Sequence, residues 1–193
     1  LAFSTACAGA ADEAGTIKTR PGGFFASSDV LRITVNGRQT HGARPWAGVD
    51  PIVVASQIVN ALQTITSRQI DVTRSTGIVT IATIHGGVRS NIIPDHVEMT
   101  GTIRSLDESV RQEIHKRVKR TAEMVAAAAG ATAEVTISDG NPITYNDPAL
   151  TWKMEPTLKR VAGAAKVDMQ GDAILGAEDF AAYQQVIPGV YVI

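Results

Sequence analysis

Cysteine and long apolar runs are scarce in this chain of 193 residues. The single cysteine, Cys7, cannot form a disulfide within the chain, which fits a reducing compartment and leads us to expect a cytoplasmic protein. No apolar stretch approaches the roughly 20 residues that a membrane span requires, so we expect no membrane partner.

An excess of charge of one sign is also missing. Eighteen Lys and Arg residues against 19 Asp and Glu give a formal net charge of -1. No stretch carries five or six like charges, which argues against a nucleic-acid-binding surface. The densest basic run, residues 116–120, lies in a helical pattern beside acidic residues, and we interpret it as a solvated helix face.

Histidines at metal-ligand spacing are absent as well. The four histidines are His41, His85, His96 and His115, and no two of them form a metal-binding pattern. We expect His96 and His115 at the surface, whereas His85, at a strand end, could be either ordinary or functional. His41 lies in a loop between a strand and a helix start; such a histidine is more often ordinary than catalytic, but it is the strongest candidate here.

What the sequence does contain is a regular alternation of strand and helix patterns from about residue 29 to 139. Strand patterns cover residues 30–37, 76–84, 95–104 and 131–138. One helix is predicted to start at Asp50 and Pro51, and a second at a capping box from Ser105 to Glu108, with Gly130 as its end. The order β-α-β-β-α-β predicts an α+β, ferredoxin-like domain with four antiparallel strands and both helices on one face.

The second predicted strand, residues 76–84, is apolar on both faces. Burial under a loop is one explanation. The other is that this strand lies at a sheet edge or face that is used for self-association.

The flanking segments have a different character. Residues 1–28 are rich in Ala, Gly and Ser, and a new helix is predicted to start at Asp147 and Pro148, with Pro156 kinking or dividing it. Residues 190–193 form an apolar strand pattern. Because the chain begins without Met and ends within a strand pattern, we expect it to be part of a longer protein.

Three further positions are candidates for chemistry, each with an ordinary alternative. Arg104 ends a strand and could pair with Glu98 at the surface or clamp a carboxylate. Asn91 lies between two strands, where turn formation alone could explain it. Glu178 and Asp179 are adjacent acids that could simply favour a helix N-terminus.

Five segments carry a resemblance to a known family. They are residues 37–46, 48–53, 86–95, 101–107 and 176–180. In these segments and in their order, the chain resembles the aminoacylase/carboxypeptidase family of two-metal amidohydrolases, which includes hippurate hydrolases and N-acyl-amino-acid amidohydrolases. The resemblance covers nearly the whole chain.

This resemblance implies a domain organisation. Residues 27–140 would be the family's lid, or dimerisation, domain, and residues 1–26 and 141–193 would be pieces of its α/β metallo-hydrolase domain. In the family the lid often pairs with its twin through a strand edge and a helix, so a homodimer is expected. Such pairing would account for a strand that is apolar on both faces.

The resemblance also implies roles for individual residues. His41 matches a lid histidine that reaches an active site, commonly that of the partner subunit, and stabilises the oxyanion there. Asn91 and Arg104 match residues that hold the substrate's carboxylate, and Glu178 matches an acidic position near the substrate pocket. The implied substrate is an N-acyl-amino acid or a similar peptide-like amide. Two divalent ions, zinc or manganese, would activate the water.

The chain departs from the family in its metal ligands. The family's ligand motifs are missing, and Cys7 falls near the place of one ligand histidine, where we interpret it as a free, inert thiol. We therefore expect this chain to bind no metal by itself and to be incomplete as a catalyst. A non-catalytic, self-associating lid module is the alternative, and a ferredoxin-like regulatory domain that binds a small ligand is a third possibility.

Overall fold

The computed structural model of the chain describes residues 2–5 and 13–193, so Cys7 lies outside the described residues. The chain divides into two compact units. One consists of residues 29–140, and the other combines residues 1–28 with 141–193. Each unit is described by itself.

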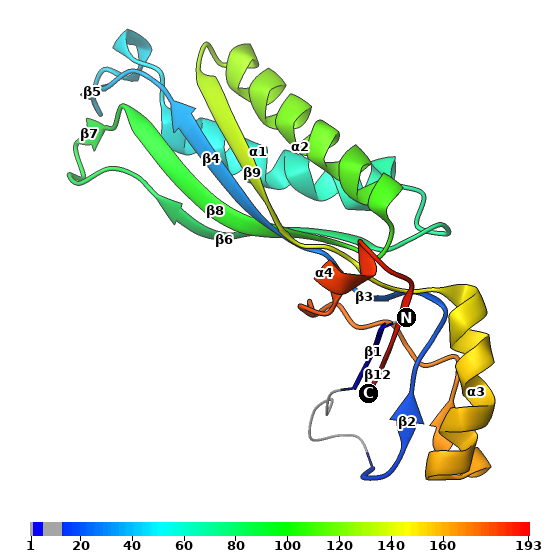
Figure 1. The fold of residues 1–193 in the computed structure, drawn as a ribbon. Helices are drawn as coiled ribbons and strands as arrows, with labels where there is room; N and C mark the ends of the chain where they lie inside the picture. The colour runs from blue at the N-terminus through cyan, green and yellow to red at the C-terminus, as the bar shows by residue number, and fades with distance from the viewer. Residues whose placement is uncertain (1, 6–12) are drawn as a thin grey trace. The chain divides into compact units, whose positions relative to one another are not determined.

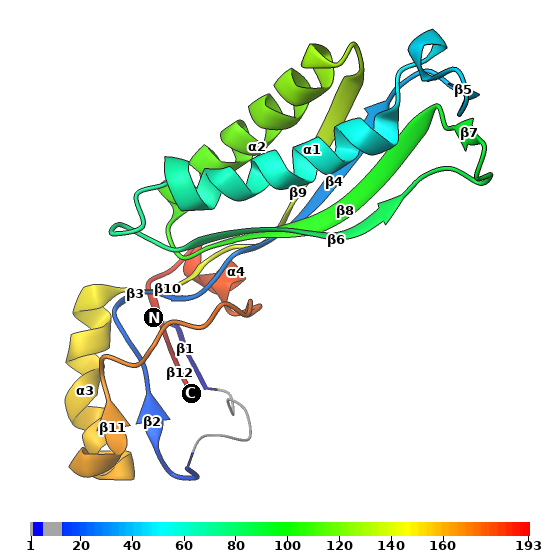
Figure 2. The ribbon, with the colours of Figure 1, turned by 180° about the vertical axis from the view of Figure 1, so that it is seen from behind.

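Residues 29–140 form a four-stranded sheet with two long helices on one of its faces (Figures 1 and 2). The strands are β4 (Ser28–Asn36), β6 (Gly77–His85), β8 (His96–Ser105) and β9 (Thr132–Asn141), in the order β6-β8-β4-β9. The helices are α1 (Pro51–Thr64) and α2 (Glu108–Ala128). Strand β8 is antiparallel to both β4 and β6. This topology confirms the predicted ferredoxin-like arrangement.

The helices of this unit start at side-chain caps. The Oδ1 atom of Asp50 accepts the backbone N–H groups of Ile52 and Val53 at 2.9 and 3.3 Å, and Pro51 occupies the first helical turn, as predicted. The predicted capping box of α2 is wrong. Asp107, not Ser105, is the N-cap, and its Oδ1 atom accepts the N–H of Val110 at 3.0 Å.

Apolar side chains from the sheet and both helices make one core. Its fully buried members include Leu31, Ile33, Val35, Met99 and Ile103 from the sheet and Ile58, Leu62, Ile114 and Val118 from the helices. Burying one such side chain contributes about 1.5–3 kcal/mol. The helix-covered face of the sheet therefore holds this unit together.

Strand β6 lies at the edge of the sheet, as one of the two explanations for its apolar sequence predicted. Burial under a loop does not occur, because residues 82–85 are exposed. The pairing of β6 with β8 shifts between Ile81 and Thr83, which makes a β-bulge. Gly101 lies opposite this bulge, where a Cβ atom would overlap the carbonyl oxygen of Thr80.

The described residues of the second unit form short strand pairs and two α-helices. The pairs are β1 (Ala2–Thr5) with β12 (Gly189–Val192), β2 (Ile17–Lys18) with β11 (Val167–Asp168), and β3 (Gly22–Phe25) with β10 (Thr144–Asn146). The helices are α3 (Pro148–Ala162) and α4 (Ala181–Gln184). Asp147 caps α3 as predicted, but Pro156 does not divide this helix.

A buried asparagine joins the strands of this second unit. The Oδ1 atom of Asn146 accepts the backbone N–H of Tyr191 at 2.7 Å, and its Nδ2 atom donates to the carbonyl of Arg20 at 2.9 Å. Both side-chain ends of Asn146 are thus used, which offsets the cost of burying an amide. Across residues 2–5 and 13–193, no helix is long and apolar enough to cross a bilayer.

Candidate functional site

A two-residue ladder at one end of the sheet of residues 29–140 brings two of the predicted site residues together (Figure 1). Its strands are β5 (Thr40–His41) and β7 (Ile92–Ile93), in which His41 pairs with Ile92. The next hydrogen bond joins the N–H of Gly42 to the carbonyl of Asn91 at 2.8 Å. His41 and Asn91, fifty positions apart in the sequence, are therefore neighbours.

The ring of His41 has one nitrogen committed to the backbone. Its Nδ1 atom accepts the N–H of Ala43 at 3.0 Å. An accepting Nδ1 carries no proton, so the proton of the neutral ring is on Nε2. The side chain is exposed. His41 can therefore donate one hydrogen bond from Nε2 without first taking up a proton.

Asn91 is the third residue of a β-turn. The N–H of Ile92 donates to the carbonyl of Arg89 at 3.3 Å, which closes the turn around Ser90 and Asn91. Gly42 packs against this turn, and a Cβ atom there would lie 3.3 Å from the carbonyl oxygen of Asn91. The close approach of the two segments thus favours glycine at position 42.

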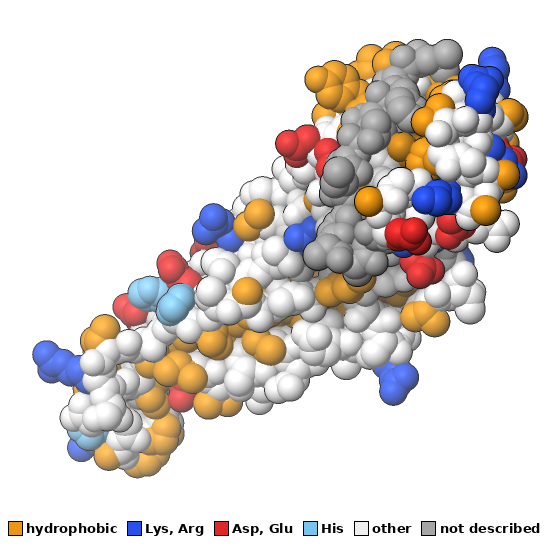
Figure 3. Space-filling model, turned by 90° about the horizontal axis from the view of Figure 1, so that it is seen from below, with side chains coloured by type: hydrophobic (Ala, Val, Ile, Leu, Met, Phe, Trp, Pro, Cys, Tyr) orange, Lys and Arg blue, Asp and Glu red, His pale blue; other side chains and the backbone are white. Residues whose placement is uncertain are grey.

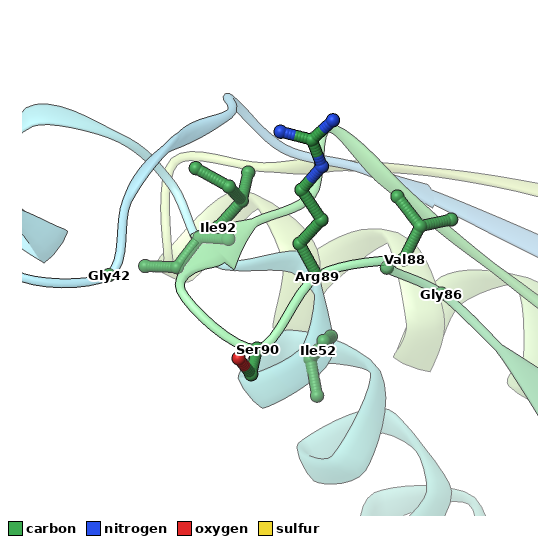
Figure 4. Close-up of a pocket in the computed structure, with 9 residues that line it drawn as sticks. Gly42, Ile52, Gly86, Val88, Arg89, Ser90 and Ile92 are labelled. Carbon is green, nitrogen blue, oxygen red and sulfur yellow. The ribbon is translucent and has the colours of Figure 1, made fainter.

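A hollow of about 500 Å³ lies beside this turn (Figure 4). It is lined by Gly42, Ile52, Gly86, Gly87, Val88, Arg89, Ser90, Ile92 and Ile93. Apart from Arg89 the lining is uncharged and mainly apolar. Figure 3 shows the same end of this unit at the lower left, where hydrophobic side chains gather beside basic ones.

Arg104 lies toward the opposite end of the sheet. It is near the end of β8, where it pairs with Ile78 of β6. It follows His96, the first residue of that strand, by eight positions, which is about 27 Å at the rise of an extended strand. Within one chain the structure does not bring Arg104 together with His41 and Asn91.

Glu178 belongs to the other unit, in the segment that precedes α4. It is half-buried, and its Oε1 atom accepts the N–H of Phe180 at 3.4 Å. Burial, and then the hydrogen bond and the charge of Glu178, raise the pKa of Tyr191 to about 12. Tyr191 therefore stays neutral and can donate to Glu178. The adjacent Asp179 has its own partner, because its Oδ1 atom accepts from Nδ2 of Asn141 at 2.7 Å.

The most polar buried cluster was not predicted from the sequence. Arg111 approaches the fully buried Asp29 through two atoms, with Nε 2.9 Å from Oδ2 and Nη2 2.5 Å from Oδ1. The Nε2 atom of His115 lies 2.8 Å from the same Oδ2. Burial alone would raise the pKa of Asp29, but hydrogen bonds from His115 and Arg111 and the charge of Arg111 outweigh it and lower the pKa to about 2.

This cluster corrects the prediction that His115 is a surface residue, since only 14% of its side chain is exposed. The signal available in the sequence was that Arg111 and His115 are four residues apart and so share one helix face. The cluster is structural, because it fastens both ends of the unit to α2. Asp29 lies at one end, and at the other the N–H of Gly140 donates to Oδ1 of Asp29 at 3.4 Å.

Metal ligands do not converge in the described part of the chain. Within it, no group of three or more His, Cys, Asp or Glu side chains is placed to hold a metal ion. The residues discussed above can therefore be given roles in binding and orientation, but none as a metal ligand.

Comparison with known proteins assigns the family. Residues 28–129 match the model of the M20 peptidase dimerisation domain, which covers most of the four-stranded sheet and both of its helices. The chain belongs to the M20 peptidase family. The predicted resemblance to an aminoacylase/carboxypeptidase-type family is confirmed.

Named relatives of this M20 chain are hydrolases. Thermostable carboxypeptidase 2 of Saccharolobus solfataricus is 40% identical over 178 residues, which are 92% of this chain and 44% of that protein. N-acetyl-L-cysteine deacetylase of Bacillus subtilis is 36% identical over 178 residues, 92% of this chain and 42% of that protein.

A solved structure shows the same fold. The YXEP protein of Bacillus subtilis, described as a dinuclear metal-binding peptidase of the M20 family, superposes with a TM-score of 0.79 at 29% identity. The match covers 98% of this chain and 46% of that one. The M20 chain thus spans less than half the length of each of these proteins.

Proposed function

We propose that the complete protein hydrolyses the amide bond of an N-acyl-amino acid or a similar peptide-like amide. The observation that carries this proposal is the β5–β7 ladder, which sets Asn91 beside a histidine whose Nε2 is available as a donor. The names of the two relatives, a carboxypeptidase and a deacetylase, both describe amide hydrolysis.

In this reaction a water oxygen bonds to the acyl carbon, the C–N bond breaks, and the leaving amine takes up a proton. Negative charge develops on the carbonyl oxygen. A hydrogen bond from Nε2 of His41 stabilises that charge, as a preorganised donor does in an oxyanion hole. Asn91 and Arg104 hold the carboxylate of the amino acid, for which the planar guanidinium is well suited.

The separation of Arg104 from His41 and Asn91 supports a site shared by two chains. The edge strand β6 offers unpaired backbone groups, and β6 of a second copy can pair with it about a twofold axis. Pairing of the two β6 strands in antiparallel fashion brings the β5–β7 end of one chain to the Arg104 end of its partner. We therefore propose a homodimer through this domain.

The remaining parts of the proposal follow from the family. Residues 27–140 act as the lid, and residues 1–26 and 141–193 belong to the catalytic domain, where Glu178 lies near the substrate pocket and Tyr191 orients it. Two divalent ions, zinc or manganese, belong to the proposal for the complete protein and are assigned no ligand among the described residues. The single cysteine supports a cytoplasmic location.

The test is complementation between two inactive variants of the complete gene product, His41→Ala and Arg104→Ala. Each variant alone is expected to have lost most of its hydrolysis of N-acyl-amino acids. In a mixed dimer, one site combines the intact Arg104 of the first variant with the intact His41 of the second. Random mixing should restore roughly a quarter of wild-type activity, because half of the dimers are mixed and each has one intact site.

Absence of any restored activity, in a sample where mass analysis shows mixed dimers, would contradict the shared site. Wild-type protein that hydrolyses no N-acyl-amino acid would contradict the proposed reaction itself. The control is a mixture of His41→Ala with Asn91→Ala. His41 and Asn91 lie at the same end of the sheet within one chain, so each proposed site in a mixed dimer lacks one of them. These mixed dimers should gain no activity.

A non-catalytic, self-associating lid module is the second candidate. The observation in its favour is the lack of converging metal ligands in residues 2–5 and 13–193. Such a module would dimerise without hydrolysing any amide. The hydrolysis assay on the complete gene product separates the two candidates.

A further inference from the structure

The turn that carries Asn91 also carries a cation with no assigned role. Arg89 is the first residue of that β-turn, and its carbonyl closes it. Arg89 and Asn91 are two positions apart in the chain, a backbone span of at most about 7 Å. Arg89 therefore belongs to the same small structure as His41 and Asn91.

The guanidinium of Arg89 makes no hydrogen bond or ion pair with any residue in the described ranges 2–5 and 13–193. Figure 4 shows it standing clear of the turn, on the side of Val88 and Ile92 and away from Ile52. The carboxylate of Asp95, which lines one hollow together with Arg89, is already engaged, because it bonds to Nδ1 of His96 at 2.7 Å.

Aliphatic side chains flank the guanidinium of Arg89. Val88 is 99% exposed, so the chain presents a whole aliphatic side chain to solvent next to Arg89. A second hollow, of about 280 Å³, shares Gly87, Val88, Arg89 and Ile92 with the larger one and is completed by Gln39, Pro94, Asp95 and His96. An unpaired guanidinium beside exposed aliphatic side chains is complementary to a ligand with an apolar body and an anionic end.

We propose that Arg89 is a specificity-determining residue that selects substrates whose acyl group ends in a second carboxylate. The acyl methylene groups contact Val88 and Ile92, and the distal carboxylate pairs with the guanidinium. A succinyl group has this chemistry. This inference rests on the proposed function, because it requires that the end of the sheet with His41 and Asn91 reaches a substrate.

The test compares two acyl groups of equal length on the complete gene product. N-succinyl- and N-butanoyl-amino acids differ in that only the succinyl group has the distal carboxylate. We measure kcat/KM for both series on a panel of L-amino acids, with wild type, Arg89→Gln and Arg89→Lys. Wild type should prefer the succinyl series, and Arg89→Gln should lower that preference by about tenfold or more, as expected for loss of a charge-assisted pair.

The lysine variant, the salt dependence and a control variant further test whether Arg89 binds the distal carboxylate. Arg89→Lys should keep part of the preference, and raised salt should weaken it in wild type, since a partly exposed ion pair is screened. The control Arg68→Gln removes an exposed arginine outside both hollows. It should leave the ratio of kcat/KM between the succinyl and butanoyl series unchanged.

A succinyl-to-butanoyl ratio that is the same in wild type and Arg89→Gln would overturn the inference and leave the proposed reaction standing. Equal loss for both series, accompanied by a fall in sedimentation mass, would assign Arg89 to the contact between chains and would also overturn it. No hydrolysis of either series by wild type would overturn the proposed function and this inference with it.

Discussion

A carboxylate with no exposed surface, such as that of Asp29, is stable in its charged form only if donors surround it. Arg111 supplies two atoms, His115 supplies one, and the backbone of Gly140 supplies a fourth contact. Arg111 is itself 7% exposed in its side chain. Arg111 also contacts the exposed Glu108 and Asp139, but removing either member of the Asp29–Arg111 pair leaves the other buried without its main charged partner.

Asp29→Asn should accordingly be strongly destabilising. We expect the free energy of unfolding to fall by about 3–5 kcal/mol, the usual cost of breaking a buried pair from one side. Urea denaturation followed by circular dichroism measures it. Asp139→Asn is the matched control, because Asp139 also contacts Arg111, at 3.3 Å, but is 82% exposed. That control should cost less than about 1 kcal/mol.

The difference in the free energy of unfolding between wild type and Asp29→Asn depends on pH with a definite sign. The folded pKa of Asp29, about 2, lies below the value near 4 of an unfolded aspartate. The stabilisation is thus complete above pH 4 and is lost as the pH falls through 2, with a size of about 2 kcal/mol. The difference in the free energy of unfolding between wild type and Asp29→Asn should therefore decrease as the pH falls from 4 to 2. A difference that stays constant would contradict the assigned pKa.

Residue-scale prediction from the sequence succeeded where the signal was local. Helix starts at Asp50 and Asp147 could be read directly, since an N-cap acts on residues two or three positions ahead. The Asp29–Arg111 pair could not, because its members are 82 positions apart in the sequence. The proximity of His41 and Asn91 was equally out of reach, as it depends on strands only two residues long.

At the scale of elements, apolar periodicity predicted the four strands and both long helices of residues 29–140 with bounds that differ by at most about three residues from those observed. The misassigned cap of α2 has a simple cause. Ser105 and Asp107 are both good N-cap residues, and Ser105 remains in the sheet, where it pairs with Gly77. Pro156 did not divide α3, and Leu158 of the same helix is buried in the core of its unit.

The close pairing of the edge strand β6 with β8 requires a glycine at position 101 of β8. At Gly101 a Cβ atom would overlap the carbonyl oxygen of Thr80, so Gly101→Ala must push β6 away from β8. We expect the free energy of unfolding to fall by about 1–3 kcal/mol, as in other overpacked sites. Gly176→Ala is the control, since a Cβ atom there meets only Cγ2 of Ile174 at 3.5 Å. Thermal denaturation that ranks the two variants equally would refute the argument.

At the scale of the molecule, the sequence predicted the fold class and the family, but not how one site could use both ends of a sheet. Arg104 and Asn91 are thirteen positions apart in the sequence, yet a turn and most of β8 separate them in space. The short distance between Asn91 and Arg104 in the sequence suggested that both side chains bind the same carboxylate within one chain. The strand geometry places these side chains at opposite ends of the sheet, and the proposed dimer would bring Arg104 of one chain to Asn91 of its partner.

The dimer that this requires can be tested at the edge of β6. Ile84 stands opposite Met99 and is 49% exposed, which places an apolar side chain at the free edge of the helix-covered face. Ile84→Lys puts a charge there twice in a symmetric dimer and should weaken association by about a hundredfold or more. Sedimentation should show the mass falling to that of one chain, with an unchanged circular dichroism spectrum.

Met124→Lys is the matched control for this variant. Met124 lies on α2 and is 60% exposed, so the same apolar-to-lysine change occurs on a helix surface and not on the edge strand. It should sediment as wild type does. Hydrolytic activity of the complete protein should fall together with the dimer in Ile84→Lys, because His41 of one chain would no longer reach the Arg104 end of its partner. A monomeric variant with full activity would refute the shared site, and a dimeric Ile84→Lys would refute pairing through β6.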